Sequence, residues 1–534
     1  MLYAPEQFTD DEAATLRPYF TNLDGPVFAL INLPEVVKGA LFARYSRSDK
    51  SLRRLFLDEF VGDLDLSGDL TVDATVGLRR AEELYERVFF EYGDDSVAQL
   101  GGVHLACEQA SNLLTKILEW GRLMAYLEQS TRYIPYNSRL QGRYRYCRPS
   151  EVCESSLGMR YVADLDGLFD TYSALLDPMM DWARERYPKE PHDSDFVYKQ
   201  TIKAKACDAV RGVLPAATIS NVGIYGTGQA YEALLLRMRA HPLPEAGLYA
   251  DLMLEELRKV IPSFLVRVDR PDRGGAWGEY LSKTRDDTAD LVARIFAADA
   301  PETPNADVTL LDWDPDGEDK VLAAICYPHT NLPESQLLDR VRRLPADDRI
   351  ALVHAYVGDR QNRRHKPGRA FERTGYRFDI LGDYGAFRDM QRHRMLTIEW
   401  QRLTPRHGYV VPEPVVEAGL DARFDDAMER SAALHDVLEE RFPEQAAYAV
   451  SLAYQMRYVM QMNAREAMHL CELRSSPQGH PSYRCIAQSM HRLIAEEAGH
   501  RAIAAAMRYV DHGDTELERL EAERAAEARR VVRS

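Results

Sequence analysis

The stretch Trp120-Gly-Arg-Leu-Met-Ala-Tyr-Leu-Glu-Gln-Ser-Thr-Arg-Tyr-Ile-Pro135 has a counterpart in Arg392-His-Arg-Met-Leu-Thr-Ile-Glu-Trp-Gln-Arg-Leu-Thr-Pro-Arg-His-Gly-Tyr-Val-Val-Pro412. A second pair follows in the same order: Gln229-Ala-Tyr-Glu-Ala-Leu-Leu-Leu-Arg-Met-Arg239 and Asn463-Ala-Arg-Glu-Ala-Met-His-Leu-Cys-Glu-Leu-Arg474. Two matches in one order argue for repetition of a whole unit. The sequence therefore predicts an internal duplication.

The clearest break between the two copies lies between Arg267 and Asp307. This segment contains Arg270-Pro-Asp-Arg-Gly-Gly-Ala and Ala300-Pro-Glu-Thr-Pro-Asn-Ala, a composition typical of loops and linkers. The second half opens with a strand over 308–313 and a helix around 321–325. We therefore expect a first domain at 1–285, a linker at 286–305 and a second domain at 306–534.

The composition is that of a multidomain globular protein. The chain has 534 residues, with 67 Lys and Arg against 84 Asp and Glu, so its formal net charge is −17. This acidic balance argues against a dedicated DNA or RNA binder. Seven cysteines without a Cys-x-x-Cys pair argue against a disulfide framework and a zinc ribbon, and no metal site is expected. The N-terminus lacks the pattern of a signal peptide and no apolar run is long enough for a membrane span, so we expect a cytoplasmic protein.

Three consecutive residues, Arg392, His393 and Arg394, form the sharpest local signal. Neighbours on a helix are about 100° apart, so the three cannot share one helical face. They are either a solvated helix end or a cluster around an anion. Guanidinium groups offer planar, bidentate donors to phosphates and imide-type carbonyls, which makes an anionic cofactor the functional hypothesis.

The segment from Asn463 to Arg474 has the apolar spacing of a buried helix. Eleven residues separate its ends, which returns Arg474 to nearly the same face as Asn463, about 16 Å further along the axis. Such a helix could present an amide to one end of a composite ligand site and a cation to the other. A salt bridge between helices is the structural alternative for Arg474.

Glu128, Ser130 and Arg132 stand at alternate positions, so in an extended segment all three point one way. A carboxylate suits a sugar hydroxyl, and a hydroxyl with a guanidinium suits a phosphate, as a nucleotide requires. A polar loop after a helix is the alternative. Arg211 adds a cation ahead of a proline, for which pairing with Asp208 is the structural alternative.

Together these motifs resemble the signatures of the flavin-dependent thymidylate synthases. Arg392-His-Arg, with a hydroxyl residue some way on, resembles the first signature, and Glu128 to Tyr133 resembles its Glu-x-Ser-x-Arg-Tyr end. The segment from Asn463 to Arg474 resembles the second signature helix. The resemblance spans both halves of the chain. It implies an α/β (α+β) fold of two tandem domains, each a helix-rich layer on a mostly antiparallel sheet.

The resemblance also implies an activity and its ligands. Enzymes of this family convert dUMP to dTMP by reductive methylation, with bound FAD, methylenetetrahydrofolate as carbon donor and NADPH as reductant. They are homotetramers of a single such domain, and each site is assembled from several subunits. We therefore expect a homodimer that forms a pseudo-tetramer, with a dUMP-like nucleotide and a folate as ligands.

Roles for individual residues follow from the same resemblance. At the nucleotide it places Glu128, Ser130, Arg132, Arg211 and Arg474. At the flavin it places Arg392, His393, Arg394, Asn463 and Arg465. Arg474 and Ser130 are the residues expected to act in catalysis, Arg474 because a cation stabilises the N3-deprotonated, more nucleophilic uracil.

The two halves depart from the family pattern at different positions. In the first half Trp120-Gly121 replaces the Arg-His pair, and Gln229 and Tyr231 replace the Asn and Arg of the second signature. The second half keeps those residues but has Ala447 where the first half has Arg211. The losses are complementary, which predicts composite sites whose nucleotide is bound by the first half and whose flavin is bound by the second.

The hydroxyl residue of the second half, Thr404, lies ten residues after Arg394, where the family has eight. Thr404-Pro-Arg406 is therefore a candidate for a displaced Ser-x-Arg. Two other functions stay open. One is a catalytically silent flavin- or nucleotide-binding homologue that acts as a scaffold or regulator. The other is a related flavin-dependent one-carbon transferase that acts on another pyrimidine nucleotide.

Overall fold

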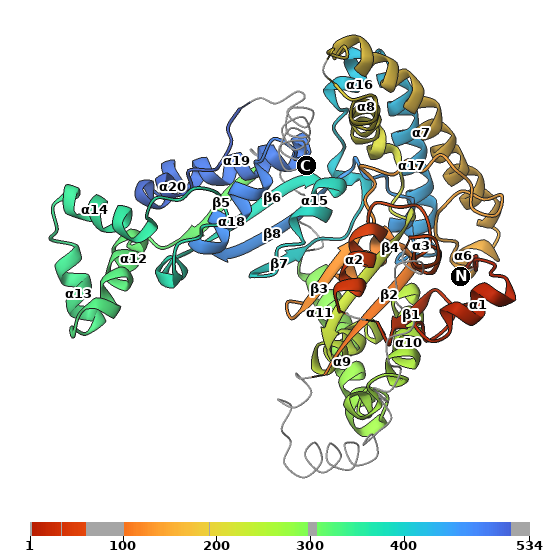
Figure 1. Cartoon of the computed structure of the whole chain (residues 1–534), viewed down its shortest axis with the longest axis horizontal. Coiled ribbons are helices and arrows are strands. Elements are labelled where there is room, and N and C mark those ends of the chain that lie inside the picture. The colour runs from red at the N-terminus through yellow and green to blue at the C-terminus, as the bar shows by residue number, and fades with distance from the viewer. Residues whose placement is uncertain (1–2, 34, 60–100, 192, 297–306, 514–534) are drawn as a thin grey trace. The chain divides into compact units, whose positions relative to one another are not determined.

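The computed structural model describes residues 3–33, 35–59, 101–191, 193–296 and 307–513 (Figure 1). The chain forms two compact units, each built from three stretches of sequence. The first unit comprises residues 1–173, 214–301 and 429–450. The second comprises residues 174–213, 302–428 and 451–534.

A four-stranded sheet lies at the centre of the first unit. Its strands are β1 (Val27–Leu30), β2 (Gly102–Ser111), β3 (Met124–Glu128) and β4 (Ile219–Thr227). Their order across the sheet is β1-β2-β4-β3, and every neighbouring pair is antiparallel.

The second unit repeats this topology. Its strands are β5 (Val308–Trp313), β6 (Gly375–Asp383), β7 (Leu396–Trp400) and β8 (Gln455–Asn463). Their order is β5-β6-β8-β7, again with antiparallel neighbours. Two sheets with one strand order confirm the expected tandem fold, in which helices pack on mostly antiparallel sheets.

The pairing register corrects one alignment made from sequence. Gly102 pairs with Thr227 in the first sheet, and Gly375 pairs with Asn463 in the second. Thr227 is therefore the counterpart of Asn463, two residues before the position that sequence similarity indicated, which was Gln229. The error arose because the similarity followed the Ala and Glu residues of the helix, whereas the register is set by the strand that precedes it.

Each unit has two junctions where a strand runs directly into a helix, and each junction has a capping side chain. Ser111 and Thr227 cap the helices that follow β2 and β4, by accepting the backbone N–H of the third helical residue. Asp383 and Asn463 do the same after β6 and β8. Ser, Thr, Asp and Asn are the preferred N-cap residues because their oxygens satisfy otherwise unpaired N–H groups.

Equivalent helices cover equivalent sheets. The first unit has α5 (Asn112–Leu118), α9 (Gly228–Arg239) and α10 (Pro244–Arg258), with α10 packed on α9, α5, β1 and β2. The second unit has α15 (Tyr384–Met390), α18 (Ala464–Arg474) and α19 (Pro481–Glu496), with α19 packed on α18, α15, β5 and β6.

Further helices surround these layers. They are α1 (Asp10–Leu16), α2 (Glu35–Tyr45), α3 (Leu52–Glu59), α6 (Ser150–Cys153), α7 (Gly158–Arg186), α8 (Asp195–Val210), α11 (Ala276–Ile295), α12 (Gly317–Cys326), α13 (Glu334–Val341), α14 (Ala346–Val357), α16 (Glu413–Glu417), α17 (Asp421–Glu439) and α20 (Arg501–Ala506). A core of buried side chains from α1, α2, α3 and β1 forms in the first unit. There α2 lies so close to β4 that a Cβ on Gly223 would be 2.5 Å from a ring carbon of Phe42.

The two units exchange segments of sequence. The stretch 174–213 belongs to the second unit, although the duplication places it in the first half, and 429–450 belongs to the first unit. Matching backbone hydrogen bonds accompany the exchange: Ala217 donates to Tyr448 in the first unit, and Ala453 donates to Gly212 in the second, both at 3.0 Å. The expected division at 1–285 and 306–534 therefore does not coincide with the compact units.

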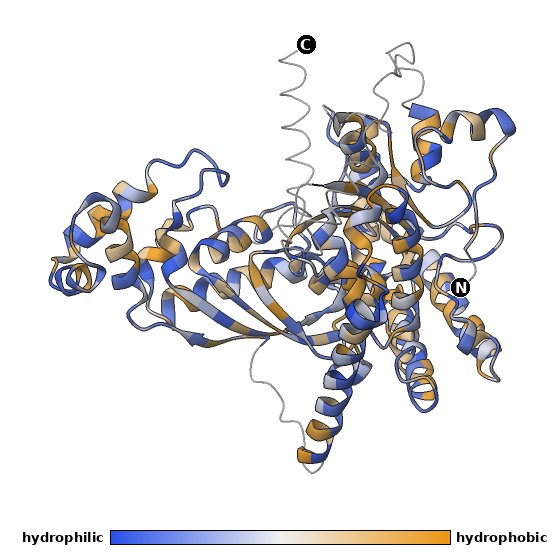
Figure 2. Cartoon of the chain, turned by 90° about the horizontal axis from the view of Figure 1, so that it is seen from below, coloured by the Kyte–Doolittle hydropathy of each residue, from blue (hydrophilic) through white to orange (hydrophobic). Residues whose placement is uncertain are grey.

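Within the expected linker at 286–305, residues 286–295 are the last turns of helix α11, and residues 297–305 lie outside the described residues. Polar and apolar residues are interleaved along the helices (Figure 2), as expected for elements with one buried face. Among the described helices, none is long and apolar enough to cross a bilayer.

Candidate functional site

The Arg392-His-Arg segment is the loop between α15 and β7, not a helix end. Exposed and buried side chains alternate along this loop: Arg392 and Arg394 are exposed, and His393 is buried. The loop therefore presents two cations on the surface of the second unit and places an imidazole inside it.

His393 connects this loop to helix α18. Its Nδ1 lies 2.8 Å from Oε1 of Glu466, and its Nε2 accepts a hydrogen bond from Nε of Arg474 at 3.1 Å. An arginine can only donate, so Nε2 must carry a lone pair and Nδ1 carries the proton of a neutral imidazole. This arrangement orients the Arg474 side chain.

Burial determines the protonation of this cluster. It lowers the pKa of His393 well below its usual value, and the neighbouring Arg474 lowers it further. Burial also raises the pKa of Glu466. It lowers the pKa of His469, one turn along α18, to about 4. The imidazole groups are therefore neutral at physiological pH, and the positive charge of the site resides on arginine and lysine.

Asp389, at the end of α15, links two arginines from distant parts of the sequence. Nη1 of Arg474 donates to Oδ1 of Asp389 at 3.4 Å, and Nη1 of Arg211 lies 4.0 Å from Oδ2. Arg211 is in the second unit because the exchanged stretch 174–213 carries it there. The predicted residues Arg211, His393 and Arg474 thus form one cluster with Asp389 and Glu466.

Arg211 is buried, with only 4% of its surface exposed, and its Nη2 has no hydrogen-bond partner among the residues that the structure describes. A Cβ on Gly385 would lie 3.2 Å from this nitrogen, so glycine leaves room for the guanidinium beside α15. The carboxyl of Asp383 is close enough for Arg211 to lower its pKa, but burial is the stronger effect and the net shift is upward. A buried, unsatisfied donor is costly unless a ligand completes it.

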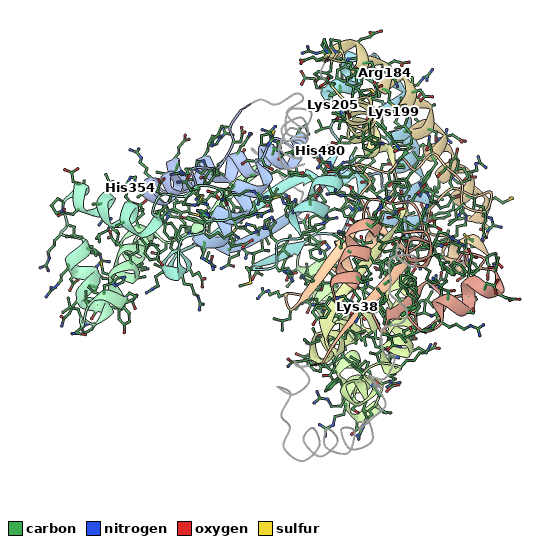
Figure 3. All side chains as sticks on the ribbon, in the orientation of Figure 1. Lys38, Arg184, Lys199, Lys205, His354 and His480 are labelled. Carbon is green, nitrogen blue, oxygen red and sulfur yellow. The ribbon has the colours of Figure 1, made fainter. Side chains whose placement is uncertain are left out.

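Helix α19 closes the cluster on another side. The ring of Tyr483 lies under the Arg474 guanidinium, 5.5 Å from its carbon to the ring centroid. His480, marked in Figure 3, caps α19 through Nδ1, and its Nε2 lies 3.3 Å from the backbone oxygen of Asp208. The exchanged helix α8 is thereby tied to the same helix that supports Arg474.

Asn463 and Arg465 have structural contacts. Oδ1 of Asn463 accepts the N–H of Glu466 at 2.9 Å as the cap of α18, which leaves the amide nitrogen for another acceptor. Arg465 donates to the backbone oxygen of Pro367 at 3.0 Å and pairs with Glu372 at 3.4 Å. Their expected roles at a flavin remain predictions.

The remaining predicted residues lie in the first unit. Glu128 is buried and pairs with Nζ of Lys116 at 3.2 Å, while Lys116 also pairs with Glu119 at 2.5 Å. Oγ of Ser130 accepts the backbone N–H of Arg132 at 3.3 Å. Glu128 therefore has a structural partner, and the alternation expected of an extended strand ends in a turn.

The second unit contains a turn like the one at Ser130, shifted by two residues relative to the end of the equivalent strand. Gln129 and Gln401 occupy equivalent positions, since their N–H groups donate to Asn221 and Arg457, which correspond in the two sheets. Oγ1 of Thr404 accepts the N–H of Arg406 at 3.4 Å, as Ser130 does from Arg132. The local geometry supports the interpretation of Thr404-Pro-Arg406 as a displaced Ser-x-Arg.

Sequence reasoning did not identify Asp389, Glu466 or His469. Glu466 and His469 could have been found, because they lie three and six residues after Asn463 on one helix. Ligand atoms of His393, Glu466 and His469 lie within 4.8 Å of one another, a spacing that a metal ion could use. Arg474 donates to the same imidazole, however, and Lys366, Arg465 and Arg394 act electrostatically on Glu466. This cationic surrounding favours an anion.

Comparisons with known proteins identify the family of this chain. Residues 47–263 and 309–499 match the family described as thymidylate synthase complementing protein. A UPF0159 protein of Chlamydia muridarum is 39% identical over 529 residues, which cover 98% of this chain and 99% of that protein. A UPF0159 protein of Chlamydia pneumoniae is 38% identical with the same coverage. UPF0159 protein Ta1429 of Thermoplasma acidophilum is 31% identical over 516 residues, or 91% of this chain and 97% of its own length. The chain therefore belongs to the thymidylate synthase complementing protein family, whose sequence it matches in two successive regions.

Proposed function

We propose that this protein catalyses the flavin-dependent reductive methylation of dUMP to dTMP, with methylenetetrahydrofolate as carbon donor and NADPH as reductant. The observation that carries the proposal is the pair of arginines, Arg211 and Arg474, which converge on Asp389 in the unit that contains Arg392-His-Arg. A buried cation with an unsatisfied nitrogen suits the phosphate dianion of a nucleotide.

The residues present suit a flavin cofactor. Arg392 and Arg394 are exposed cations on one loop, and the amide nitrogen of Asn463 points from a helix cap that uses only the oxygen. These donors fit a polyanionic dinucleotide with imide carbonyls. FAD, when bound, would supply the hydride that completes the methyl group.

The chain's own side chains would bind and polarise the pyrimidine. Arg211 would bind the nucleotide phosphate, and Arg474 would lie at the edge of the uracil. Neutral His393 holds the Arg474 guanidinium through Nε2, while Glu466 holds the imidazole through Nδ1. A cation that is held in place without reorganisation stabilises the ionised uracil more than the neutral one, which favours the nucleophilic form.

A catalytically silent nucleotide binder is the second candidate, and the buried Glu128–Lys116 pair favours it. Glu128 would have to break that pair to reach a sugar hydroxyl. Anaerobic turnover of dUMP with methylenetetrahydrofolate and NADPH, assayed for dTMP, distinguishes the two. Formation of dTMP by the purified flavoprotein supports the synthase. Tight dUMP binding without any dTMP, in protein that carries its flavin, supports the silent binder and refutes the synthase.

The proposal includes a homodimer that forms a pseudo-tetramer. Sedimentation equilibrium of the purified protein would give twice the chain mass of 60.8 kDa. A monomer that turns over dUMP would refute the assembly and leave the activity standing.

A further inference from the structure

A cavity of about 300 Å³ lies in the first unit, and none of the residues of the proposed active site lines it. It opens beside the start of β4 and is lined by residues from the N-terminal segment, from β2 and from the segment 140–148. Its volume is at the lower end of the range for small-molecule sites, which is too small for a dinucleotide such as FAD.

The lining is cationic. Arg143, Arg145 and Arg148 belong to it, and among the described residues no aspartate or glutamate lines the cavity. Arg143 is exposed and has no side-chain partner in the described part of the chain. Nε of Arg145 is buried and has no hydrogen-bond partner within the described ranges, although Nη2 of the same side chain donates to the backbone oxygen of Pro135 at 2.7 Å.

Arg148 is held in position by its neighbours. It donates to the backbone oxygens of Tyr144 and Tyr146 at 3.2 Å and lies 3.8 Å above the Tyr146 ring. The nearest carboxylate, Asp166, is 4.0 Å away and already accepts from the Tyr146 hydroxyl at 2.9 Å. The cavity therefore contains a surplus of ordered positive charge, which favours an anion.

Backbone strain coincides with this cavity. Gln109 and Gln141 have φ angles of +56° and +50°, and both line it. Residues other than glycine seldom adopt such angles, and those that do are concentrated at ligand sites and clamps.

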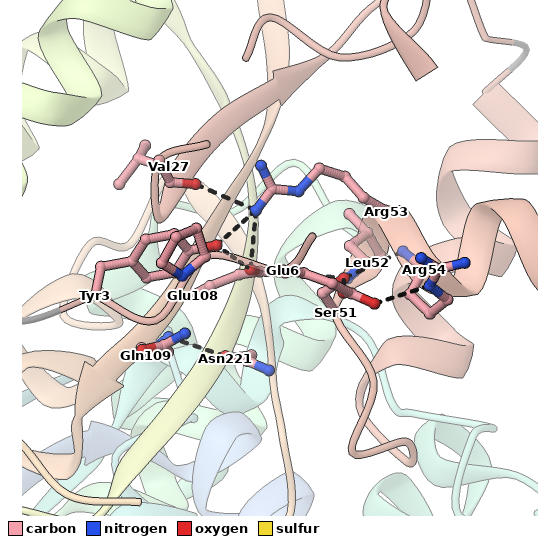
Figure 4. Close-up of polar contacts among 12 residues, drawn as sticks. Tyr3, Glu6, Val27, Ser51, Leu52, Arg53, Arg54, Glu108, Gln109 and Asn221 are labelled. Atoms are coloured by element: carbon pink, nitrogen blue, oxygen red, sulfur yellow. Dashed lines mark hydrogen bonds and ion pairs between the residues drawn. The ribbon is translucent and has the colours of Figure 1, made fainter. Parts of the chain in front are cut away.

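The strained glutamines hold the N-terminal segment across the cavity. The Gln109 amide exchanges hydrogen bonds with the backbone of Ala4, at 3.1 and 3.3 Å, and Gln141 donates to the oxygen of Pro5 at 3.1 Å. Tyr3, which also lines the cavity, is anchored through its hydroxyl to Arg53 at 2.7 Å (Figure 4). The two glutamines with positive φ thus fix the position of the N-terminal segment at Tyr3 to Pro5, which is called the covering segment below.

In the described part of the second unit, two of these three arginines have no cationic counterpart. Backbone hydrogen bonds from Ile219 to Arg145 and from Gln455 to Gly408 are equivalent, so Gly408 is the counterpart of Arg145. By the same register Val411 is the counterpart of Arg148, since the bridges at Tyr146 and Tyr409 correspond. Two of the three cations are therefore specific to the first unit and are not part of the repeated fold.

We propose that this cavity is a second ligand site, separate from the active site, for a small organic phosphate monoester. The phosphate dianion would contact Arg143, Arg145 and Arg148. The tyrosine edges and the covering segment would enclose the organic part. The dianion would also supply the partner that the buried Nε of Arg145 lacks.

The test is isothermal titration of the full-length protein with three probes that lack a pyrimidine: inorganic phosphate, ribose 5-phosphate and glycerol 3-phosphate. At least one organic phosphate should bind with one-to-one stoichiometry and more tightly than inorganic phosphate. Arg143→Ala should weaken that binding at least tenfold, because it removes one of the three guanidinium groups that would contact the phosphate. The fold should be unaffected, because the Arg143 side chain has no partner among the described residues. Arg148→Ala should do the same, with circular dichroism to confirm that the protein is folded.

Two variants serve as controls. Arg17 is an exposed arginine of the same unit, so Arg17→Ala should leave the affinity unchanged. Arg132→Ala should also leave it unchanged, which separates this site from the proposed dUMP site. Absence of binding by all three probes, equal affinity in Arg143→Ala, or loss of binding in Arg132→Ala would overturn the proposal. Equal affinity for inorganic phosphate and both organic phosphates would overturn its organic part.

Discussion

Replacement of Arg211 by methionine tests whether the exchanged segment supplies the nucleotide's phosphate site. Methionine keeps much of the aliphatic volume and removes the charge. Among the described residues, Arg211 lies 4.0 Å from Asp389, which keeps its hydrogen bond to Arg474, and it also acts electrostatically on Asp383. Because methionine removes the buried charge together with its unsatisfied donor, we expect the free energy of unfolding to change by about 1 kcal/mol or less.

The effect on nucleotide binding should be much larger. The buried Nη2 of Arg211 has no hydrogen-bond partner in the described part of the chain, and the proposed phosphate would supply one. A hydrogen bond to a charged group contributes roughly 1.5–3 kcal/mol. One such bond to a phosphate oxygen corresponds to a loss of about 10- to 150-fold in dUMP affinity.

The assay is dUMP titration of the purified protein by calorimetry, beside a urea unfolding curve for each variant. Arg423, an exposed residue of α17 in the same unit, provides the matched control Arg423→Met. The reasoning is refuted if Arg211→Met binds dUMP as the wild type does. It is also refuted if the variant unfolds several kcal/mol more easily, since Arg211 would then be a structural ion-pair partner.

Four further predictions concern other residues of the site. In the wild type, the native state keeps the His393 imidazole neutral, whereas the unfolded chain takes up a proton near pH 6.5, so stability present above that pH is lost as the pH falls. His393→Gln should therefore flatten the fall in stability between about pH 7.5 and 5, which thermal unfolding at several pH values would record. Asn463→Ala should lose about 1 kcal/mol of stability and also the flavin absorbance, because it removes both the helix cap and the amide. Asn463→Thr introduces the residue type that caps α9 in the first unit, so it should keep the stability and lose the flavin. Arg474→Ala should lower the single-turnover rate more than the dUMP affinity, because its interaction strengthens as the uracil ionises. Arg132→Ala should weaken dUMP binding and leave the flavin content intact, as absorbance titration would measure.

Each of these has a contradicting outcome. An unchanged pH profile in His393→Gln would mean that this imidazole takes up its proton alike in the native and the unfolded state. Full flavin content in Asn463→Thr would assign Asn463 to capping alone. Equal losses of rate and affinity in Arg474→Ala would place its contact at the phosphate. Unchanged dUMP affinity in Arg132→Ala would move the search to Thr404-Pro-Arg406.

The sequence by itself determined the duplication and the type of fold. Apolar spacing, the repeated motifs and the capping residues are local properties, so they predict where strands and helices form without knowledge of their neighbours. The Arg392-His-Arg and Asn463–Arg474 segments were identified in this way, and the structure places His393 and Arg474 in contact. The alignment of Gln229 with Asn463 was wrong because helical similarity carries no information on strand register.

Only the tertiary structure decided which of the predicted residues come together in the candidate site. Arg211 and Arg474 meet at Asp389 because the stretch 174–213 folds into the second unit, and nothing in its own sequence records that exchange. The same holds for the neutrality of His393, which follows from burial beside an arginine 81 positions away in sequence. Local sequence specifies which backbone conformation is favourable, whereas the environment of a charge depends on every segment that packs around it.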